Sequence, residues 1–228
     1  KHRKLKPTMF ERTVWGEGDG SSLVVYERPY GRLGGLNCWE HQMVLPGYAL
    51  ISQGIQVHAG AWPGGSFTRQ DVLSREFAMQ SGAYVVMAGA LIREEDLPPE
   101  IRELRMEIGG VQRHLVMPCD GLSGIIAPNG DYLAGPVQGE ETVLTATANL
   151  GTVMFQKMIA DHAGHYTRPD VFDFRVNRRP KQVATFDVDP AAAARIMDGL
   201  ASGGIGDSAA LLGAIEDTGA FPGRSHGG

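Results

Sequence analysis

The sequence has little of what marks a membrane protein or a disulfide-stapled one. Its 228 residues include two cysteines, Cys38 and Cys119, which cannot build a disulfide framework. The longest apolar runs, such as residues 23–26 and 84–88, fall far short of the roughly 18 residues that a membrane helix needs. The chain also opens on basic residues rather than on an apolar leader. We therefore expect a reducing, cytoplasmic setting and no membrane partner.

Excess positive charge is absent as well. The formal net charge is −5, and this mild acidic balance argues against nucleic acid as a partner. Hydrophobic residues make up 43% of the chain and charged residues 21%, a composition typical of a folded globular protein. Glycine is abundant, with 31 residues, which predicts many tight turns and close backbone approaches.

Strand and helix patterns alternate along the first 90 or so residues. Strands are predicted at residues 23–26, 33–37, 55–61 and 84–88, each an apolar run bounded by turn residues. Helices are predicted at residues 40–52, with Gly54 as the stop, and from the N-cap Thr68 to Gln80, with Gly82 as the stop. This alternation predicts an α/β fold with crossover connections.

The later half is less regular. We expect a charged helix or lid at residues 98–108, strands at 123–127 and 142–148 around a turn at 128–131, and a helix at 151–163. From about Pro190 the chain is rich in Ala and Gly. The predicted organisation is one domain over residues 1–180, followed by a largely flexible tail at 181–228.

Cys38 stands at the end of a predicted strand and the start of a predicted helix. At such a turn, backbone amides and the helix dipole favour a thiolate, and the amide of the next residue, Trp39, could bind a developing negative charge. Burial as a small hydrophobic residue is the commoner fate of a cysteine. Position alone leaves both interpretations open.

Two segments narrow the choice, and they are Arg3-Lys4-Leu5-Lys6-Pro7-Thr8 followed by Glu11-Arg12, and Asn37-Cys38-Trp39-Glu40-His41. Their order and spacing resemble the catalytic-lysine and catalytic-cysteine segments of nitrilases in the carbon-nitrogen hydrolase superfamily. Residues 62–63, 125–130 and 164–170 also follow the nitrilase pattern. The resemblance extends from Lys1 to about Pro180. It implies the C-terminal two-thirds of a nitrilase, with the N-terminal part missing.

The resemblance implies a four-layer αββα sandwich, incomplete at the N-terminus, and assigns three site residues. Cys38 would be the nucleophile, Lys4 the cation of a Glu-Lys-Cys triad, and Glu11 a second acidic residue beside them. The first glutamate of the triad, the general base, would lie upstream of Lys4, where this sequence offers no acidic residue. The implied reaction converts an organic nitrile to a carboxylic acid and ammonia through a thioimidate and a thioester, and we expect the chain to be inactive alone.

Further residues are expected around this site. Trp39 and Trp62 flank it and would suit an apolar substrate pocket, although tryptophans are more often core residues. Glu40 and His41 would support it from behind, and His58 is interpreted as a histidine of the core or a similar support. A zinc site built from Cys38-x-x-His41 and His162-x-x-His165 matches no standard spacing, so no metal or cofactor is expected.

Two other functions remain open at this point. An amidase or a cyanide-converting relative would use the same triad. A non-catalytic assembly subunit would keep the subunit contacts that the resemblance implies, which form homo-oligomers or helical filaments. The sequence does not distinguish aromatic from aliphatic nitriles.

Overall fold

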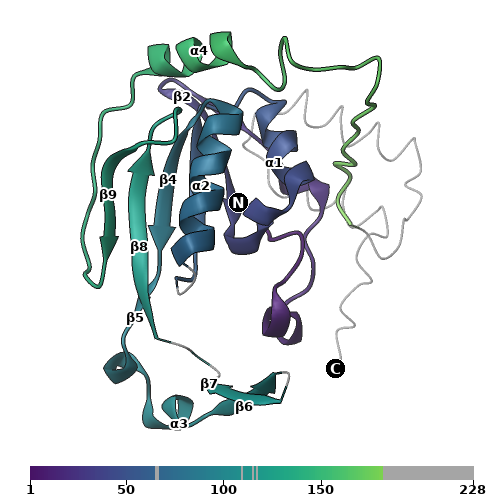
Figure 1. The fold of residues 1–228 in the computed structure, drawn as a ribbon. Helices are drawn as coiled ribbons and strands as arrows, with labels where there is room; N and C mark the ends of the chain where they lie inside the picture. Colours follow the sequence, from purple (N-terminus) through teal and green to yellow (C-terminus); the bar gives the residue numbers. More distant parts are fainter. Residues whose placement is uncertain (65–66, 109, 115, 117, 182–228) are drawn as a thin grey trace, which may run out of the picture. The chain divides into compact units, whose positions relative to one another are not determined.

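A mixed seven-stranded sheet forms the centre of the computed structural model, which describes residues 1–64, 67–108, 110–114, 116 and 118–181 (Figure 1). The strands β2 (Gly31–Asn37), β3 (Val57–Trp62) and β4 (Tyr84–Gly89) are neighbours and run parallel. Parallel neighbours need a crossover connection, and here helices supply it. The α/β class predicted from the sequence is confirmed.

Antiparallel strands extend the sheet on both sides. The short β1 (Tyr26–Arg28) forms a hairpin with β2. The longest strand, β8 (Cys119–Ile126), pairs with β4, with β5 (Leu91–Ile92) and with β9 (Tyr132–Gln138). A separate two-stranded sheet consists of β6 (Arg105–Ile108) and β7 (Val111–His114).

Helices α1 (Val44–Ile51) and α2 (Phe67–Ser81) cover one face of the sheet, in front of it in Figure 1. Apolar side chains of the two helices pack there against alternate residues of β2, β4 and β8. At one end of the sheet, α4 (Leu150–Ile159) packs on Tyr84 at the start of β4. The remaining short helices are η1 (Met9–Thr13), η2 (Gly20–Ser22), η3 (Cys38–Gln42), η4 (Glu94–Asp96) and α3 (Pro99–Arg102).

The helix predicted at residues 40–52 is wrong at its start. A short 3-10 helix, η3, ends at Gln42, Met43 is extended, and α1 begins only at Val44. Pro46 explains the break, because it lacks an N–H and therefore fits the first turn of a helix but not its interior. The predicted stops are confirmed, since Gly54 and Gly82 have φ of +74° and +62° after α1 and α2.

The later half departs more from expectation. The helix predicted at residues 98–108 is limited to α3, and β6 follows it. The turn at 128–131 is confirmed, but its second strand is β9 rather than residues 142–148, because Ile126 pairs with Tyr132 directly across the turn. The predicted helix at 151–163 corresponds to the shorter α4, and β1 begins where the strand predicted at 23–26 would end.

Of the four layers implied by the resemblance, the described residues form one large sheet with its helices, and a second large sheet is not among them. The predicted tail lies outside the described residues from position 182 onward. None of the helices in the described ranges has the length and apolar character needed to cross a bilayer.

Candidate active site

Cys38 sits where β2 passes into η3, in a strained turn. Its φ of +54° lies in the left-handed region that non-glycine residues rarely adopt, and it is 8% exposed. The preceding residue, Asn37, pairs with Ala61 on β3, so the end of β3 lies beside the turn. A sharp, strained turn between a strand and a helix is a known way to present a nucleophile.

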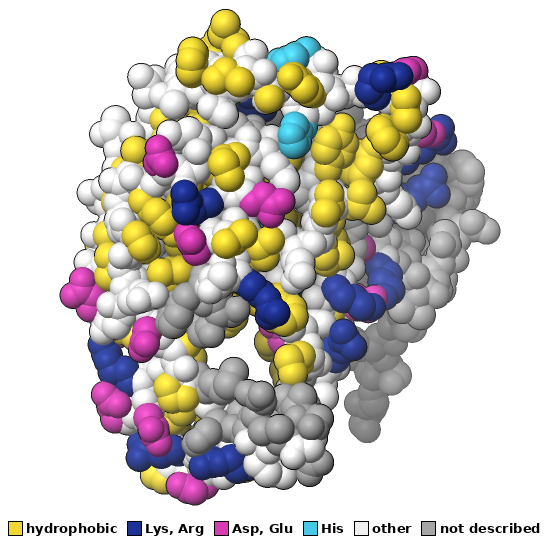
Figure 2. Space-filling view, in the orientation of Figure 1, with side chains coloured by type: hydrophobic (Ala, Val, Ile, Leu, Met, Phe, Trp, Pro, Cys, Tyr) yellow, Lys and Arg dark blue, Asp and Glu magenta, His cyan; other side chains and the backbone are white. Residues whose placement is uncertain are grey.

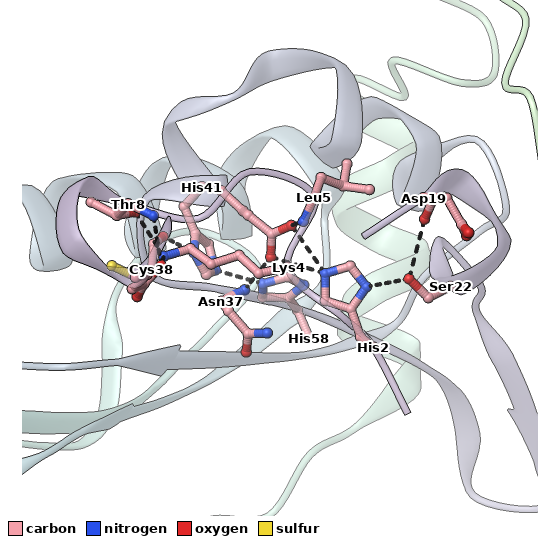
Figure 3. A network of polar contacts seen from close by, with 12 residues as sticks. His2, Lys4, Leu5, Thr8, Asp19, Ser22, Asn37, Cys38, His41 and His58 are labelled. Atoms are coloured by element: carbon pink, nitrogen blue, oxygen red, sulfur yellow. Dashed lines mark hydrogen bonds and ion pairs between the residues drawn. The ribbon is translucent and has the colours of Figure 1, made fainter. Parts of the chain in front are cut away.

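Lys4 is buried beside this turn, and two hydrogen bonds orient its ammonium group. Its Nζ atom donates to Thr8 Oγ1 and to Glu11 Oε2, both at 2.7 Å (Figure 3). The Thr8 amide donates to the same Glu11 oxygen at 2.6 Å. Glu11 therefore fixes both the charge and the direction of Lys4. The local sequence favours this, because a threonine three residues before a glutamate is the pattern of a helix N-terminal capping box.

The glycine-rich stretch at residues 16–20 supports the lysine segment from outside. The Gly18 amide donates to the Lys4 carbonyl at 2.8 Å. A Cβ atom at position 18 would come within 2.4 Å of the Arg3 carbonyl oxygen. Only glycine allows the two backbones to approach this closely.

A pocket of about 480 Å³ opens in front of Cys38. Its walls come from the N-terminal segment and from the ends of β2 and β3, so it lies at the carboxyl ends of parallel strands, the usual location of a site in an α/β sheet. The lining residues are Arg3, Lys4, Glu11, Trp15, Asn37, Cys38, Ala61, Trp62 and Pro63.

Glu40 joins the lysine segment to the cysteine turn. Its carboxylate accepts hydrogen bonds from the amide of Leu5 at 2.7 Å, from the amide of Asn37 at 2.9 Å and from His2 Nε2 at 2.9 Å. The residue is 1% exposed. Burial alone would raise the pKa of Glu40, but the hydrogen bonds from His2, Leu5 and Asn37 more than offset this and hold it below its usual value. Each amide belongs to a neighbour of a candidate catalytic residue.

His41 supports the turn from the core side. Its Nδ1 atom lies 2.7 Å from the Cys38 carbonyl oxygen, and its Nε2 atom lies 2.8 Å from His58 Nε2. Its ring also stacks on Trp62, with centroids 4.7 Å apart. The imidazole therefore contacts both the backbone of Cys38 and the pocket wall.

The electrostatic balance at Cys38 favours the protonated thiol. Burial raises its pKa, while the Lys4 charge and the Trp39 amide, which donates to the sulfur, lower it, and Glu11 and Glu40 raise it again. The net result is a raised pKa, so the expectation that the turn favours a thiolate is wrong. The physical reason is burial, which outweighs the opposing effects of the Lys4 charge and the Trp39 amide.

Comparison with known proteins shows the family of this chain. The family model of the carbon-nitrogen hydrolases matches residues 1–157. The chain belongs to the carbon-nitrogen hydrolase family. It is similar to "Nitrilase 2" of an unknown prokaryotic organism, with 47% identity over 192 residues, 83% of this chain and 58% of that protein. It is also similar to the aliphatic nitrilase of Rhodococcus rhodochrous, with 38% identity over 190 residues, 78% of this chain and 50% of that protein.

Among solved structures, the carbon-nitrogen hydrolase of Helicobacter pylori G27 shares the fold of this family member. The TM-score is 0.56 at 17% identity, over 74% of this chain and 57% of that one. The chain spans 50–58% of the length of the two nitrilases named above.

In this carbon-nitrogen hydrolase, the predicted site residues do not all face the pocket. Cys38, Lys4, Glu11 and Trp62 line it together. The Trp39 ring instead lines a neighbouring hollow of about 250 Å³ and lies 5.1 Å from the Arg69 guanidinium carbon, so only its amide points to the thiol. Glu40 and His41 are not among the residues that line the pocket, and they contact the backbone of Asn37 and of Cys38.

Sequence reasoning missed three contributors to this carbon-nitrogen hydrolase site: His2, Thr8 and the His58 contact with His41. The capping pattern formed with Glu11 could have revealed Thr8. His58 is predicted from the sequence as a core or supporting histidine, but neither its contact with His41 nor the contacts of His2 follow from a local pattern, because the partners are distant in sequence. Across the part of the chain that the structure describes, no group of three or more His, Cys, Asp or Glu residues gathers as metal ligands.

Proposed function

We propose that Cys38 is the nucleophile of a nitrilase that converts an organic nitrile and two molecules of water to a carboxylic acid and ammonia. The observation that carries this proposal is the shared pocket of Cys38 and the Lys4–Glu11 ion pair, of which Lys4 is the buried member. The two relatives described above are named nitrilases, which supports the same substrate class.

The proposed reaction begins with attack of the Cys38 sulfur on the nitrile carbon. The thiol proton moves, through a base, to the nitrile nitrogen, which gives a thioimidate. Addition of one water and loss of ammonia leave a thioester, and a second water releases the acid and restores the thiol. Each step moves a proton, so a general acid and base must face the pocket.

Lys4 suits the role of stabilising charge in this sequence. Negative charge builds on the substrate nitrogen during attack and on oxygen during water addition, and a fixed ammonium group lowers the energy of both. Glu11 and Thr8 hold the ammonium in place before substrate arrives. The Trp39 amide is the second candidate donor, because it already points to the sulfur.

Glu11 is poorly placed to act as the general base. Its carboxylate is the only one among the residues that line the described pocket, and Lys4 and the Thr8 amide both donate to its Oε2 atom. Cys38 has a raised pKa and therefore needs a base to remove its proton. We infer that this chain alone hydrolyses nitriles very slowly, and that the glutamate implied by the family resemblance supplies the missing base.

The alternatives keep distinct predictions. An amidase would use the same thiol and lysine but begin from an amide, releasing ammonia at the first step.

An assembly subunit would use surfaces rather than the pocket. Figure 2 shows hydrophobic side chains where α4 lies in Figure 1, and Met154, Phe155, Met158 and Ile159 are each more than half exposed there. Self-association into homo-oligomers or filaments remains part of this proposal.

Ammonia release from a panel of nitriles and their amides tests the function. We would compare this chain with a chimera that carries, before Lys1, the nitrilase segment holding the family's first glutamate, each with and without Cys38→Ala. The expected result is release from nitriles by the chimera, lost on the order of 10⁴-fold or more with Cys38→Ala. Release from amides alone would favour the amidase. Release that survives Cys38→Ala would reject the nucleophile.

A further inference from the structure

A row of four rings leads from the core to the pocket wall behind Cys38. Phe77 packs on His58 with ring centroids 3.9 Å apart, His58 meets His41 at 5.0 Å, and His41 stacks on Trp62 at 4.7 Å. His58 is completely buried on β3. A completely buried histidine in contact with a second, partly buried one is unusual, and neither ring has a carboxylate hydrogen-bonded to it among the described contacts.

The hydrogen bonds assign a proton to each ring. A carbonyl oxygen only accepts, so the His41 Nδ1 atom, 2.7 Å from the Cys38 oxygen, must carry hydrogen. A neutral His41 then has a bare Nε2 atom, so the hydrogen between the two rings must belong to His58 Nε2 (Figure 3). His58 Nδ1 is left as a bare acceptor, and it has no hydrogen-bond partner among the described residues.

The surroundings keep both rings neutral. Burial holds the pKa of His58 well below its usual value, and the nearby His41 and His2 lower it further. Burial also lowers the pKa of His41, against opposing effects of the Cys38 carbonyl and Glu40. The charged or titratable groups near the pair are His2, Cys38 and Glu40, and of these only Glu40 favours a positive ring.

We propose that His58 and His41 are positioning residues that form a chain of two hydrogen bonds, which we call the relay. His58 Nε2–H donates to His41 Nε2, and His41 Nδ1–H donates to the Cys38 carbonyl oxygen. The relay rests on the proposed role of Cys38 as nucleophile. In a trans peptide the C=O and the N–H point in opposite directions. Holding the Cys38 carbonyl toward the core therefore aims the Trp39 N–H at the thiol.

The backbone at Cys38 is strained, and the hydrogen bond from His41 to the Cys38 carbonyl stabilises it. Cys38 has a left-handed backbone that an unsupported cysteine disfavours. If the carbonyl were released, the peptide between Cys38 and Trp39 could rotate, and the amide would no longer lower the pKa of the thiol. The effect should therefore be measurable at the sulfur, whether or not a nitrile is present.

Two substitutions at one position separate the two hydrogen bonds. In His41→Asn the side-chain NH₂ can occupy the place of Nδ1 and still donate to the Cys38 carbonyl, whereas His41→Gln reaches toward His58 and releases the carbonyl. The readout is the iodoacetamide alkylation rate of Cys38 from pH 6 to 10, followed by peptide mapping, with Cys119 as the internal reference and urea unfolding as the check of folding.

The relay predicts that His41→Gln raises the apparent pKa of Cys38 and slows its alkylation at pH 8 by about threefold to tenfold. His41→Asn should stay within about twofold of the wild-type rate. Equal rates in the two folded variants, whether fast or slow, would overturn the assignment.

A second measurement needs no substitution. Imidazole ¹⁵N NMR of the wild-type chain should show hydrogen on Nδ1 of His41 and on Nε2 of His58 at pH 7.5, and the opposite tautomer in either ring would overturn the relay. Neither experiment uses a nitrile, so a chain that passes both and yet releases no ammonia as the chimera would refute the proposed function and leave the relay standing.

Discussion

The two sides of Cys38 differ in almost every physical respect. On the pocket side, Lys4 and Glu11 form an ion pair, and the Glu11 side chain keeps 30% of its surface exposed. On the core side, His41 and the fully buried His58 are held neutral. The charged groups thus face the space where a substrate would enter. The conformation of the turn is supported by groups that stay neutral at neutral pH. The comparison suggests that reactivity and position are controlled from opposite sides of one residue.

Glu40 is the exception on the core side, because it is both charged and buried, as Lys4 is on the pocket side. It remains ionised because three donors converge on its carboxylate, and two of them are the amides of Leu5 and Asn37. Glu40 therefore links the Lys4 segment, on the pocket side, to the strained turn at Cys38.

Replacing Glu40 should have the largest effect. Glu40→Gln puts an NH₂ group among donors and removes a buried charge, so we expect a loss of about 2–4 kcal/mol in the free energy of unfolding. Urea unfolding followed by circular dichroism measures this. The matched control is Glu17→Gln, which breaks the exposed Lys6–Glu17 pair and should leave the urea midpoint unchanged. Equal effects of the two variants would contradict the role given to Glu40.

The two charges on the pocket side should shift the pKa of the Cys38 thiol in opposite directions. Lys4→Met removes a charge that lowers the pKa of Cys38, and Glu11→Gln removes one that raises it. Alkylation of Cys38 at neutral pH should slow in the first variant and quicken in the second, by up to about tenfold for each unit of pKa. Shifts of the same sign in both would show that the ion pair acts through structure rather than charge.

The two histidines on the core side should make the stability of the fold depend on pH. The folded chain holds the pKa of His58 and of His41 below the usual 6.5, so the unfolded chain takes up more protons as the pH falls. Stability should therefore be complete above about pH 6.5 and fall below it, by at most about 1.4 kcal/mol per pH unit for each histidine. The pKa of Glu40 is also lowered, but from 4.5, so its loss begins at lower pH.

Urea midpoints at pH 7.5, 6.5 and 5.5 measure this slope. His58→Phe, which keeps a ring in the core, should reduce it by about half, because one of the two protons is removed from the balance. An unchanged slope in the variant would contradict the neutral pair.

The smallest effect is expected at Gly60, where β3 passes under the histidine. A Cβ atom there would lie 3.2 Å from His41 Nε2, so Gly60→Ala should displace the ring and cost about 1 kcal/mol. At Gly47, in α1, a Cβ atom would meet Phe77 at an ordinary 3.5 Å, so Gly47→Ala should be neutral or stabilising by up to about 1 kcal/mol. Thermal unfolding of the pair distinguishes close approach to the relay from a general effect of alanine.

The sequence predicted best where local signals agree. β3 and β4 are short apolar runs, glycine stops follow α1 and α2, and all of them lie close to where they were expected. The helix predicted at 98–108 and the strand predicted at 142–148 were wrong because charge and apolar content there do not distinguish helix, strand and loop. Pairing of Ile126 with Tyr132 across the turn decided the second strand.

The candidate site was predicted in part for a similar reason. Motif spacing placed Cys38, Lys4 and Glu11 together, but the protonation of Cys38 depends on burial, which spacing does not reveal. The direction of the Trp39 ring follows from its contact with Arg69, and the His58 relay follows from which ring nitrogen faces which partner. These features exist only once distant segments have packed.

The most direct test of the central claim is to capture the covalent intermediate. The chimera described above would be quenched in acid during turnover of a nitrile and digested, and the peptides of Cys38 and Cys119 analysed by mass spectrometry. We predict the mass of the substrate's acyl group on Cys38, none on Cys119, and none in Cys38→Ala. Ammonia release with Cys38 unmodified and Cys119 or another residue carrying the acyl group would contradict the account.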